Sequence, residues 1–444
     1  MRKLACHLGL ALVLMHAGRA MAQSGEAEAG LPARADVVAA LDAAPGVRAA
    51  LARADAARAE AQVLARGPHE FTLTTTYASR TVNDGTGVAN GRFNEFSAEV
   101  TRPFRLPGKA ALDREIGQQG VTYAGNMAED ARHQAALLLA QDWWDWMGAT
   151  QEAKVDAQAV KNAEALLASV KRRVALRDAS RLEEDQASAA LGAVAAQASR
   201  SAGRVVVARV RLTAQFPALP LPVTAPDAPV PSPPPGGFAM LHDHILGESH
   251  ELAAAQALAR QAEAQADRAR KERRGDPTFG LRVFSEKGGM EKGGGLVFSM
   301  PFGGGYRSAQ ADRASAQASA AQADLQAVRY SIDETADADL AEAQVALATW
   351  GDARAALDAQ MAALLKIRRG QNLGEIGLAE VLLAERMMHD AFRAEAIARI
   401  DALRAITKIR IDSHQLWIGD DDGGGAQAPA PSPSGGSRFS LPSP

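Results

Sequence analysis

Thr101-Arg102-Pro103-Phe104-Arg105-Leu106-Pro107-Gly108-Lys109 and Ser299-Met300-Pro301-Phe302-Gly303-Gly304-Gly305-Tyr306-Arg307 are two versions of one segment, with their Pro-Phe pairs 198 residues apart. Each version ends a predicted strand hairpin and leads into a long, alanine-rich helical pattern. The two helical patterns turn near 175–180 and 374–378 and then run back. Repetition at this period predicts two similar halves that form one body rather than separate domains.

The composition favours an extended helical protein. Aromatic residues make up only 5% of the 444 residues, whereas 47% are hydrophobic in the broad sense that includes alanine. Such a chain suits long helices that pack through small residues better than a bulky globular core. The formal net charge of −3 argues against nucleic acid as a partner.

The first 22 residues have the layout of a cleavable secretory signal. Arg2 and Lys3 precede an apolar run, and Ala20-Met21-Ala22 supplies small residues for cleavage after Ala22. The alternative is a buried first helix. Cleavage would remove three basic residues and no acid, changing the net charge from −3 to −6, and would remove the single cysteine, Cys6. We therefore expect an exported chain without disulfides or thiolate metal sites.

The remaining chain divides into two repeats. The first, over 23–216, is expected to hold a helix, a strand hairpin at 70–102 and a long helical hairpin at 110–216. The second, over 238–416, repeats this plan with strands at 278–300 and a helical hairpin at 308–415. A proline-rich connector at 217–237 joins them, and 417–444 is expected to be a disordered tail. We expect the helix at 248–274 to stack end to end on the helix that ends near Phe216.

The predicted strands are apolar on one side only. Phe71, Leu73 and Tyr77 share one face of the first strand, and threonines share the other. Four strands cannot close a barrel, so either several chains complete the sheet or it packs on the protein's own helices. Aromatic residues at the strand ends lie where the girdle of a membrane barrel needs them, although ordinary packing is the alternative: Tyr77, Phe104, Phe302 and Tyr306.

Catalytic and cofactor motifs do not stand out. The glycine runs at 293–295 and 303–305 lack the flanking residues of a phosphate loop, so we expect turn glycines. His242, His244 and His250 form the only metal-like cluster, and we interpret these histidines as incidental side chains at a helix start. Trp143, Trp144 and Trp146 are expected to pack against neighbouring helices. The sequence thus favours a protein that is not an enzyme and needs no cofactor.

The turns at the far ends of the helical hairpins are the candidate interaction sites. The segments 171–183 and 368–381 align at an offset of 197, which matches Glu183 with Glu380. Small residues at such a tip permit close approach by helices of another chain, and nearby charges can set the register. The alternative is an ordinary charged, solvated turn.

The chain resembles the TolC-type outer membrane channels, which serve tripartite efflux pumps and type I secretion. The resemblance rests on the duplicated helix, strand-hairpin and long-helix pattern and on the tip Leu373-Gly374-Glu375-Ile376-Gly377-Leu378-Ala379-Glu380-Val381-Leu382-Leu383-Ala384. The segment Pro103-Phe104-Arg105-Leu106-Pro107-Gly108-Lys109 is similar to the corner of the cobalt-zinc-cadmium branch, which serves heavy-metal pumps of the resistance-nodulation-division (RND) class. The second repeat departs from this corner, with Gly303-Gly304-Gly305 in its place.

This resemblance implies a mainly α fold with a β-barrel portion. A homotrimer would form a 12-strand barrel in the outer membrane of a Gram-negative bacterium, continued by a helical tunnel across the periplasm. Glu183 and Glu380 match acids that line the closed entrance, while Leu383 replaces a second acid. The residues matching the docking tips, which would meet a periplasmic adaptor and an inner-membrane RND pump, are Val174, Ala175, Leu176, Ser180, Leu373, Gly374, Gly377 and Leu378.

The function implied by the resemblance is a passive exit duct for a heavy-metal efflux system. Two alternatives stay open: a channel for drug efflux or type I secretion, and a periplasmic coiled-coil structural or adaptor protein whose strands pack on its own helices.

Overall fold

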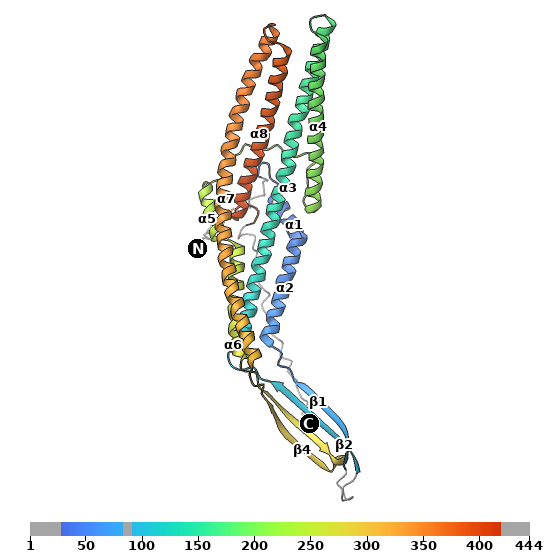
Figure 1. Cartoon of the computed structure of the whole chain (residues 1–444), viewed down its shortest axis with the longest axis vertical. Coiled ribbons are helices and arrows are strands. Elements are labelled where there is room, and N and C mark those ends of the chain that lie inside the picture. The colour runs from blue at the N-terminus through green and yellow to red at the C-terminus, as the bar shows by residue number, and fades with distance from the viewer. Residues whose placement is uncertain (1–27, 83–90, 419–444) are drawn as a thin grey trace, which may run out of the picture.

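The computed structural model describes residues 28–82 and 91–418 and shows a long helical shaft with a small sheet at one end (Figure 1). The predicted secretory signal, the tip of the first strand hairpin and residues 419–444 lie outside the described residues. Trp417 and Ile418, which the sequence analysis assigned to the tail, are instead buried in the core at 3% and 8% exposure.

Each repeat contributes two short helices, two strands and two long helices. The first repeat contains α1 (Arg34–Ala43), α2 (Pro45–Arg66), β1 (Thr72–Val82), β2 (Gly91–Pro103), α3 (Lys109–Ala175) and α4 (Arg181–Gln215). The second contains α5 (Phe238–Gly247), α6 (His250–Glu272), β3 (Thr278–Glu286), the short 3₁₀ helix η1 (Lys287–Gly289), β4 (Glu291–Ser299), α7 (Gly305–Asn372) and α8 (Leu378–Asp412). Helix α5 is not anticipated by the sequence analysis, which starts the second repeat's helix at 248.

The long helices span the whole shaft. Helix α3 has 67 residues and α7 has 68, which at 1.5 Å per residue gives each a length of roughly 100 Å. In the half of the shaft nearest the hairpin tips, the helices pack side by side in the order α4, α3, α8, α7. In the half nearest the sheet, the order is α2, α3, α6, α7. The helices therefore form a single wall, and no packing in the described residues joins α7 back to α2 or α4.

The end-to-end stacking differs from the expectation. Helix α4 meets the first helices of its own repeat, because Leu212 and Phe216 pack with Val37 and Leu41 of α1. Helix α8 lies above α6 in Figure 1. The rings of His250, at the start of α6, and His414, just after α8, are in contact. The predicted stacking of α6 on α4 was wrong because the connector carries the chain across the shaft before α5 begins.

The four strands form one antiparallel sheet in the order β1-β2-β3-β4. Leu73 pairs with Val100, Val100 with Leu281, and Leu281 with Leu296, so one apolar row crosses all four strands. The next residues in the register make the opposite face polar, with Thr74, Glu99 and Arg282 in one row. No α-helix packs on the described strands, and Leu73, Leu281 and Leu296 are 64–87% exposed. The alternative in which the sheet packs on the protein's own helices is therefore wrong.

Strand β4 starts earlier than the sequence suggests. Gly293, Gly294 and Gly295, interpreted as turn glycines, pair with Phe284, Val283 and Arg282 of β3. A Cβ atom on Gly293 would lie only 2.5 Å from the Phe284 ring, so this ring covers the position of the missing side chain. Glycine is present here because the strands pack closely, not because the chain turns. A sequence pattern does not distinguish these two uses of glycine.

The main core lies in the middle of the shaft. Trp143, Trp144 and Trp146 of α3 are at most 2% exposed and pack with the N-terminal segment, the connector and residues 416–418. The Trp143 indole donates to the Gly30 carbonyl at 2.8 Å, and the Trp144 indole donates to Thr407 Oγ1 at 2.9 Å. The prediction that these rings pack against neighbouring segments is confirmed.

A buried lysine fixes the joint between the sheet and the shaft. Lys109, at the start of α3, is 1% exposed and donates to the Arg274 carbonyl at 2.7 Å and to Asp276 Oδ1 at 2.9 Å. Its third partner is Glu272, at 3.0 Å. Burial raises the pKa of Asp276, but the hydrogen bonds from Lys109 and the Leu106 amide, together with the charges of Lys109 and Arg268, outweigh it and hold that pKa below its ordinary value. The exit of the first hairpin is thereby fastened to the entry of the second.

Helix α3 approaches α2 most closely at Gly117, where a Cβ atom would lie 2.9 Å from the Ala61 Cα. Gly117→Ala is expected to lower the free energy of unfolding by about 1–3 kcal/mol, because backbone on the facing helix cannot move aside easily. The matched control is Gly125→Ala in the same helix, which has open space and is expected to gain up to about 1 kcal/mol. Equal effects in denaturant unfolding would show that the helices do not meet at Gly117.

Candidate functional site

The two hairpin tips have the same backbone geometry. Helix α3 ends at Ala175 and α4 begins at Arg181, and the equivalent bounds in the second repeat are Asn372 and Leu378. In both tips one residue adopts the left-handed conformation, Arg177 with φ 65° and Gly374 with φ 79°. The amides of these residues and of their successors donate to helix carbonyls in the same Schellman pattern. The offset of 197 inferred from the sequence is therefore also the structural offset.

Most of the proposed docking residues lie at the surface of the tips. Leu176 and Leu373 are 79% and 66% exposed, although apolar side chains of this size are usually buried. Leu378 differs from them, because it is only 4% exposed and packs with Leu167 and Ala187. It joins the two helical hairpins to each other and offers no surface to a partner. The remaining residues of the set are exposed or half-buried: Val174, Ala175, Ser180, Gly374 and Gly377.

The two entrance acids have different surroundings. Glu183 Oε2 accepts hydrogen bonds from the backbone amide of Ser180 at 2.7 Å and from its hydroxyl at 3.1 Å, while Ser180 caps the Glu183 amide. This capping box fixes the first turn of α4. Glu380 occupies the same position in α8, but its cap residue is Gly377, so its carboxylate is exposed. The Ser-x-x-Glu pattern that signals this difference is readable in the sequence, and our sequence analysis missed it.

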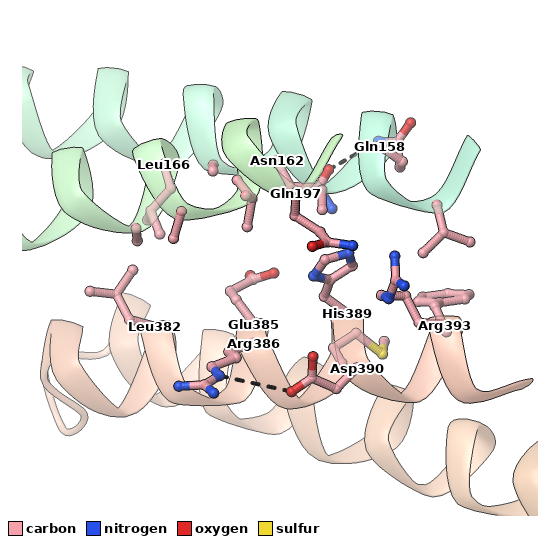
Figure 2. Close-up of a pocket in the computed structure, with 18 of the residues that line it drawn as sticks. Gln158, Asn162, Leu166, Gln197, Leu382, Glu385, Arg386, His389, Asp390 and Arg393 are labelled. Carbon is pink, nitrogen blue, oxygen red and sulfur yellow. Dashed lines mark hydrogen bonds and ion pairs between the residues drawn. The ribbon is translucent and has the colours of Figure 1, made fainter. Parts of the chain in front are cut away.

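Below the tips, a groove of about 1020 Å³ separates the first helical hairpin from α8 (Figure 2). Alanines of α3 and α4 line one side, and Leu382, Met388 and Phe392 of α8 line the other. Leu166 and Leu382 face each other toward the tip, and His389 and Arg393 extend across toward Gln197 at the other end of the groove. The groove therefore lies between the packing of Leu167 with Leu378 on the tip side and the contacts of His389 and Arg393 with α3 on the other side.

A buried ion cluster closes that end of the groove. Asp156 of α3 has no exposed surface and accepts hydrogen bonds from Arg393 at 2.6 and 2.8 Å and from His389 Nε2 at 2.7 Å. Arg393 also donates to Glu152 at 2.5 Å. Burial raises the pKa of Asp156, but the hydrogen bonds from Arg393 and His389 outweigh it and lower that pKa below its ordinary value. This cluster connects α3 of the first hairpin to α8 of the second through buried ion pairs at the end of the groove.

Arg393→Met tests that connection. The change leaves Asp156 buried without its cationic partner, which is expected to lower the free energy of unfolding by about 3–5 kcal/mol. The double variant Arg393→Met with Asp156→Leu is expected to recover most of this loss, because no buried charge remains. Arg386→Met is the control on the same helix, since its weak pair with Asp390 is exposed. A loss in the control equal to that in Arg393→Met would contradict the assignment.

A second buried cluster lies at mid-shaft. Lys408 of α8 faces Asp339 of α7 and Asp412, and Asp412 Oδ1 lies 2.7 Å from His133 Nε2 of α3. Burial and the nearby charge of Asp412 raise the pKa of Asp339 to about 7. Burial also raises the pKa of Asp412. The hydrogen bonds from His133 and Asp339 and the charges of Lys408 and His133 outweigh this effect and lower the pKa of Asp412 to about 2. Asp412 is therefore the more acidic member of the carboxylate pair.

The structure separates the histidines that the sequence groups together. His242 Nε2 lies 3.2 Å from Asp337 of α7, whereas the His250 ring contacts His414. Within residues 28–82 and 91–418, no group of three or more His, Cys, Asp or Glu side chains is positioned to hold a metal ion. No described helix is long and apolar enough to cross a membrane.

The sequence matches no protein-family model and no curated protein. The fold, in contrast, matches several solved structures. The outer membrane protein VceC from Vibrio cholerae aligns with a TM-score of 0.72 at 17% identity, over 87% of this chain and 96% of that one. The Campylobacter jejuni CmeC outer membrane channel gives 0.67 at 13% identity, over 86% and 85%. The open state of the Neisseria gonorrhoeae MtrE outer membrane channel gives 0.68 at 15%, over 87% and 89%.

These likenesses define the class of fold. The chain has the fold of outer membrane channel proteins, in which a small sheet continues into a long helical shaft. The mainly helical, channel-type fold of the chain that the resemblance implied is thereby confirmed.

Proposed function

We propose that the chain is one subunit of a passive exit duct in the outer membrane of a Gram-negative bacterium, part of a tripartite efflux system. The single observation that carries this proposal is the uncovered apolar face of the four-stranded sheet. A sheet with one exposed apolar face and one polar face suits a membrane barrel, whose strands turn their apolar side to lipid and their polar side to water. Strands of 9 to 13 residues match the length that a tilted membrane strand needs.

Free edges support assembly from several copies. Strand β1 and strand β4 are the outer strands of the sheet, and their edges have no partner within the described residues. The helical wall is open in the same way, because α2 and α4 form one border and α7 forms the other. Exposed apolar side chains lie on both borders, with Val206 and Val210 on α4 and Val345 and Leu365 on α7. Three copies joined border to border would give 12 strands and a closed tunnel.

The tips would bind the other components of the pump. Leu176 and Leu373 are exposed at the end of the shaft farthest from the sheet, where a periplasmic adaptor and an inner-membrane RND pump would meet the duct. A surface of large apolar side chains with charged neighbours suits a protein partner. Because Leu378 is buried, its contribution would be to hold the tip in place rather than to contact the adaptor.

A heavy-metal cation is the substrate that we infer from the sequence of the corner at 103–109. The corner itself would not touch the substrate, because Lys109 is buried in ion pairs at the joint. Selection of the substrate is assigned to the pump, and the duct would act by steering ions past its acidic entrance.

The barrel proposal is tested by two neighbouring substitutions in the middle of β2. Ala98 shares the apolar face with Val100, and Ser97 shares the opposite face with Glu99, because alternate residues of a strand lie on the same side of the sheet. Ala98→Arg is expected to cost about 2–4 kcal/mol and to abolish the heat-modifiable oligomer in outer membrane fractions, because it places a charge against lipid. Ser97→Arg is expected to assemble normally and to conduct in planar bilayers. A chain that is monomeric and soluble without detergent would refute the proposal.

The entrance role of Glu380 has its own test. Glu380→Ala is expected to lower the cation selectivity of single channels, because it removes an exposed negative charge near the narrowest part of the duct. Glu375→Ala is the control, since Glu375 is also exposed at the tip. Unchanged selectivity and closure in the Glu380 variant would argue against the gate role. Glu183 is a poor choice for this experiment because its loss also removes a helix cap.

A further inference from the structure

One arginine lies on the apolar face of the sheet, at the end nearest the shaft. Arg102 of β2 pairs with Phe279 of β3, and Phe279 pairs with Phe298 of β4. Arg102 shares its face with Val100, because alternate residues of a strand lie on the same side of the sheet. The row of this face nearest the helices therefore holds a cation among phenylalanines.

The aromatic rings around Arg102 are exposed. The guanidinium carbon of Arg102 lies 4.9 Å from the centre of the Phe71 ring, and Phe71 is 69% exposed. Phe104, which follows β2, packs edge-on against Phe279 with ring centres 5.4 Å apart. Phe298, in the same row, is also exposed. Aromatic rings gather in this way where membrane proteins pass from the hydrocarbon to the lipid headgroups.

The guanidinium of Arg102 has donors to spare. Its Nε donates to the His69 carbonyl at 2.9 Å, which holds the side chain in one direction. Among the described residues no carboxylate forms an ion pair with Arg102, which is exposed, and Glu99 of the same strand lies on the opposite face. Arginine binds phosphate oxygens through two parallel N–H···O bonds. The terminal nitrogens of Arg102 are available for such a pair of bonds.

More cations follow where the strands meet the helices. Arg66 is the last residue of α2, Lys271 lies in the last turn of α6, and Arg274 lies between α6 and β3. All three are exposed, and no carboxylate in the described part of the chain forms an ion pair with them. Arg273 differs, because it pairs with Asp312 at 3.2 Å. An anionic membrane surface strengthens binding by about fivefold for each Lys or Arg near it.

We propose that Arg102, with the phenyl rings around it, binds the phosphate of a phospholipid at the membrane surface nearest the shaft, and that Arg66, Lys271 and Arg274 favour an anionic headgroup. The inference rests on the proposed membrane barrel and names the lipid contact that sets its depth. The apolar rows beyond Val100 would contact the acyl chains, so the phosphate site continues the apolar face. Movement of the barrel toward the hydrocarbon would bury the charge of Arg102 and is therefore opposed.

The experiment uses the full chain, purified in detergent as its oligomer, with phosphatidylglycerol or phosphatidylcholine added. Native mass spectrometry measures lipid bound to the oligomer. Arg102→Gln is expected to weaken binding of both lipids at least about fivefold, because both contain the phosphate. Arg282→Gln is the matched control and is expected to bind both lipids normally. Arg282 of β3 also lies over a phenyl ring, that of Phe284, but it belongs to the polar face.

The headgroup preference has a separate variant. The unaltered protein is expected to bind phosphatidylglycerol more tightly than phosphatidylcholine. The combined change Arg66→Gln, Lys271→Gln and Arg274→Gln is expected to remove this preference while leaving the binding of phosphatidylcholine unchanged. Inorganic phosphate is not expected to displace either lipid, because the acyl chains contribute to binding.

Assembly is measured for each variant by its heat-modifiable oligomer and its melting temperature. Arg102→Lys is the second variant at this position, because it keeps the charge but cannot form the paired bonds, and an intermediate lipid affinity is expected. Unchanged lipid affinity in Arg102→Gln, an equal loss in Arg282→Gln, or displacement of the lipid by inorganic phosphate would overturn the proposal. Any of these results in an assembled oligomer leaves the exit duct standing, whereas a chain that is monomeric and soluble without detergent refutes both proposals.

Discussion

The packing of α3 against its neighbours is the interaction on which the rest of the structure depends. A helix of 67 residues gains too little from its own hydrogen bonds to stay straight and isolated, so it relies on contacts along its length. Helices α2 and α6 pack on its half nearest the sheet, and α4 and α8 pack on its other half. Gly117 against Ala61 and Gly148 against Ile400 show how closely these helices approach. Small residues at these positions let the helices approach each other closely along the wall.

At the joint around Lys109, the helices of the shaft continue into the strands of the sheet in the same lateral order. The lateral order α2, α3, α6, α7 repeats the order β1, β2, β3, β4, and each strand connects directly to the helix in the same place. Lys109, Glu272 and Asp276 fasten the two repeats to each other at this level. The three partners satisfy the donors of the buried lysine, and the ion pairs offset the cost of removing its charge from water. Sheet and shaft are therefore open along the same two borders.

The sequence analysis did not anticipate several local features of the structure, for physical reasons that particular residues explain. The glycines at 293–295 were interpreted as a turn, yet the ring of Phe284 covers Gly293 across the strand pair. Leu378 was assigned to a docking surface, but it belongs to the packing between the hairpins. Glu183 and Glu380 align in sequence, yet a serine at one cap and a glycine at the other give their carboxylates different surroundings. Each difference depends on a neighbour that is not adjacent in the sequence or on a cap that was not recognised.

The sequence alone determined the duplication, the four strands, the two long helices, the offset between the tips and the one-sided apolar pattern of the strands. Those features follow from local periodicity and from internal repetition, which need no knowledge of tertiary contacts. Only the tertiary structure decided that α4 stacks on its own repeat, that the sheet is left uncovered, and that His133, His250 and His414 meet. These results depend on where the connector between α4 and α5 crosses the shaft and on contacts between residues more than 100 positions apart. Local sequence patterns carry no information on such contacts, because the free energy that selects them comes from packing between distant segments.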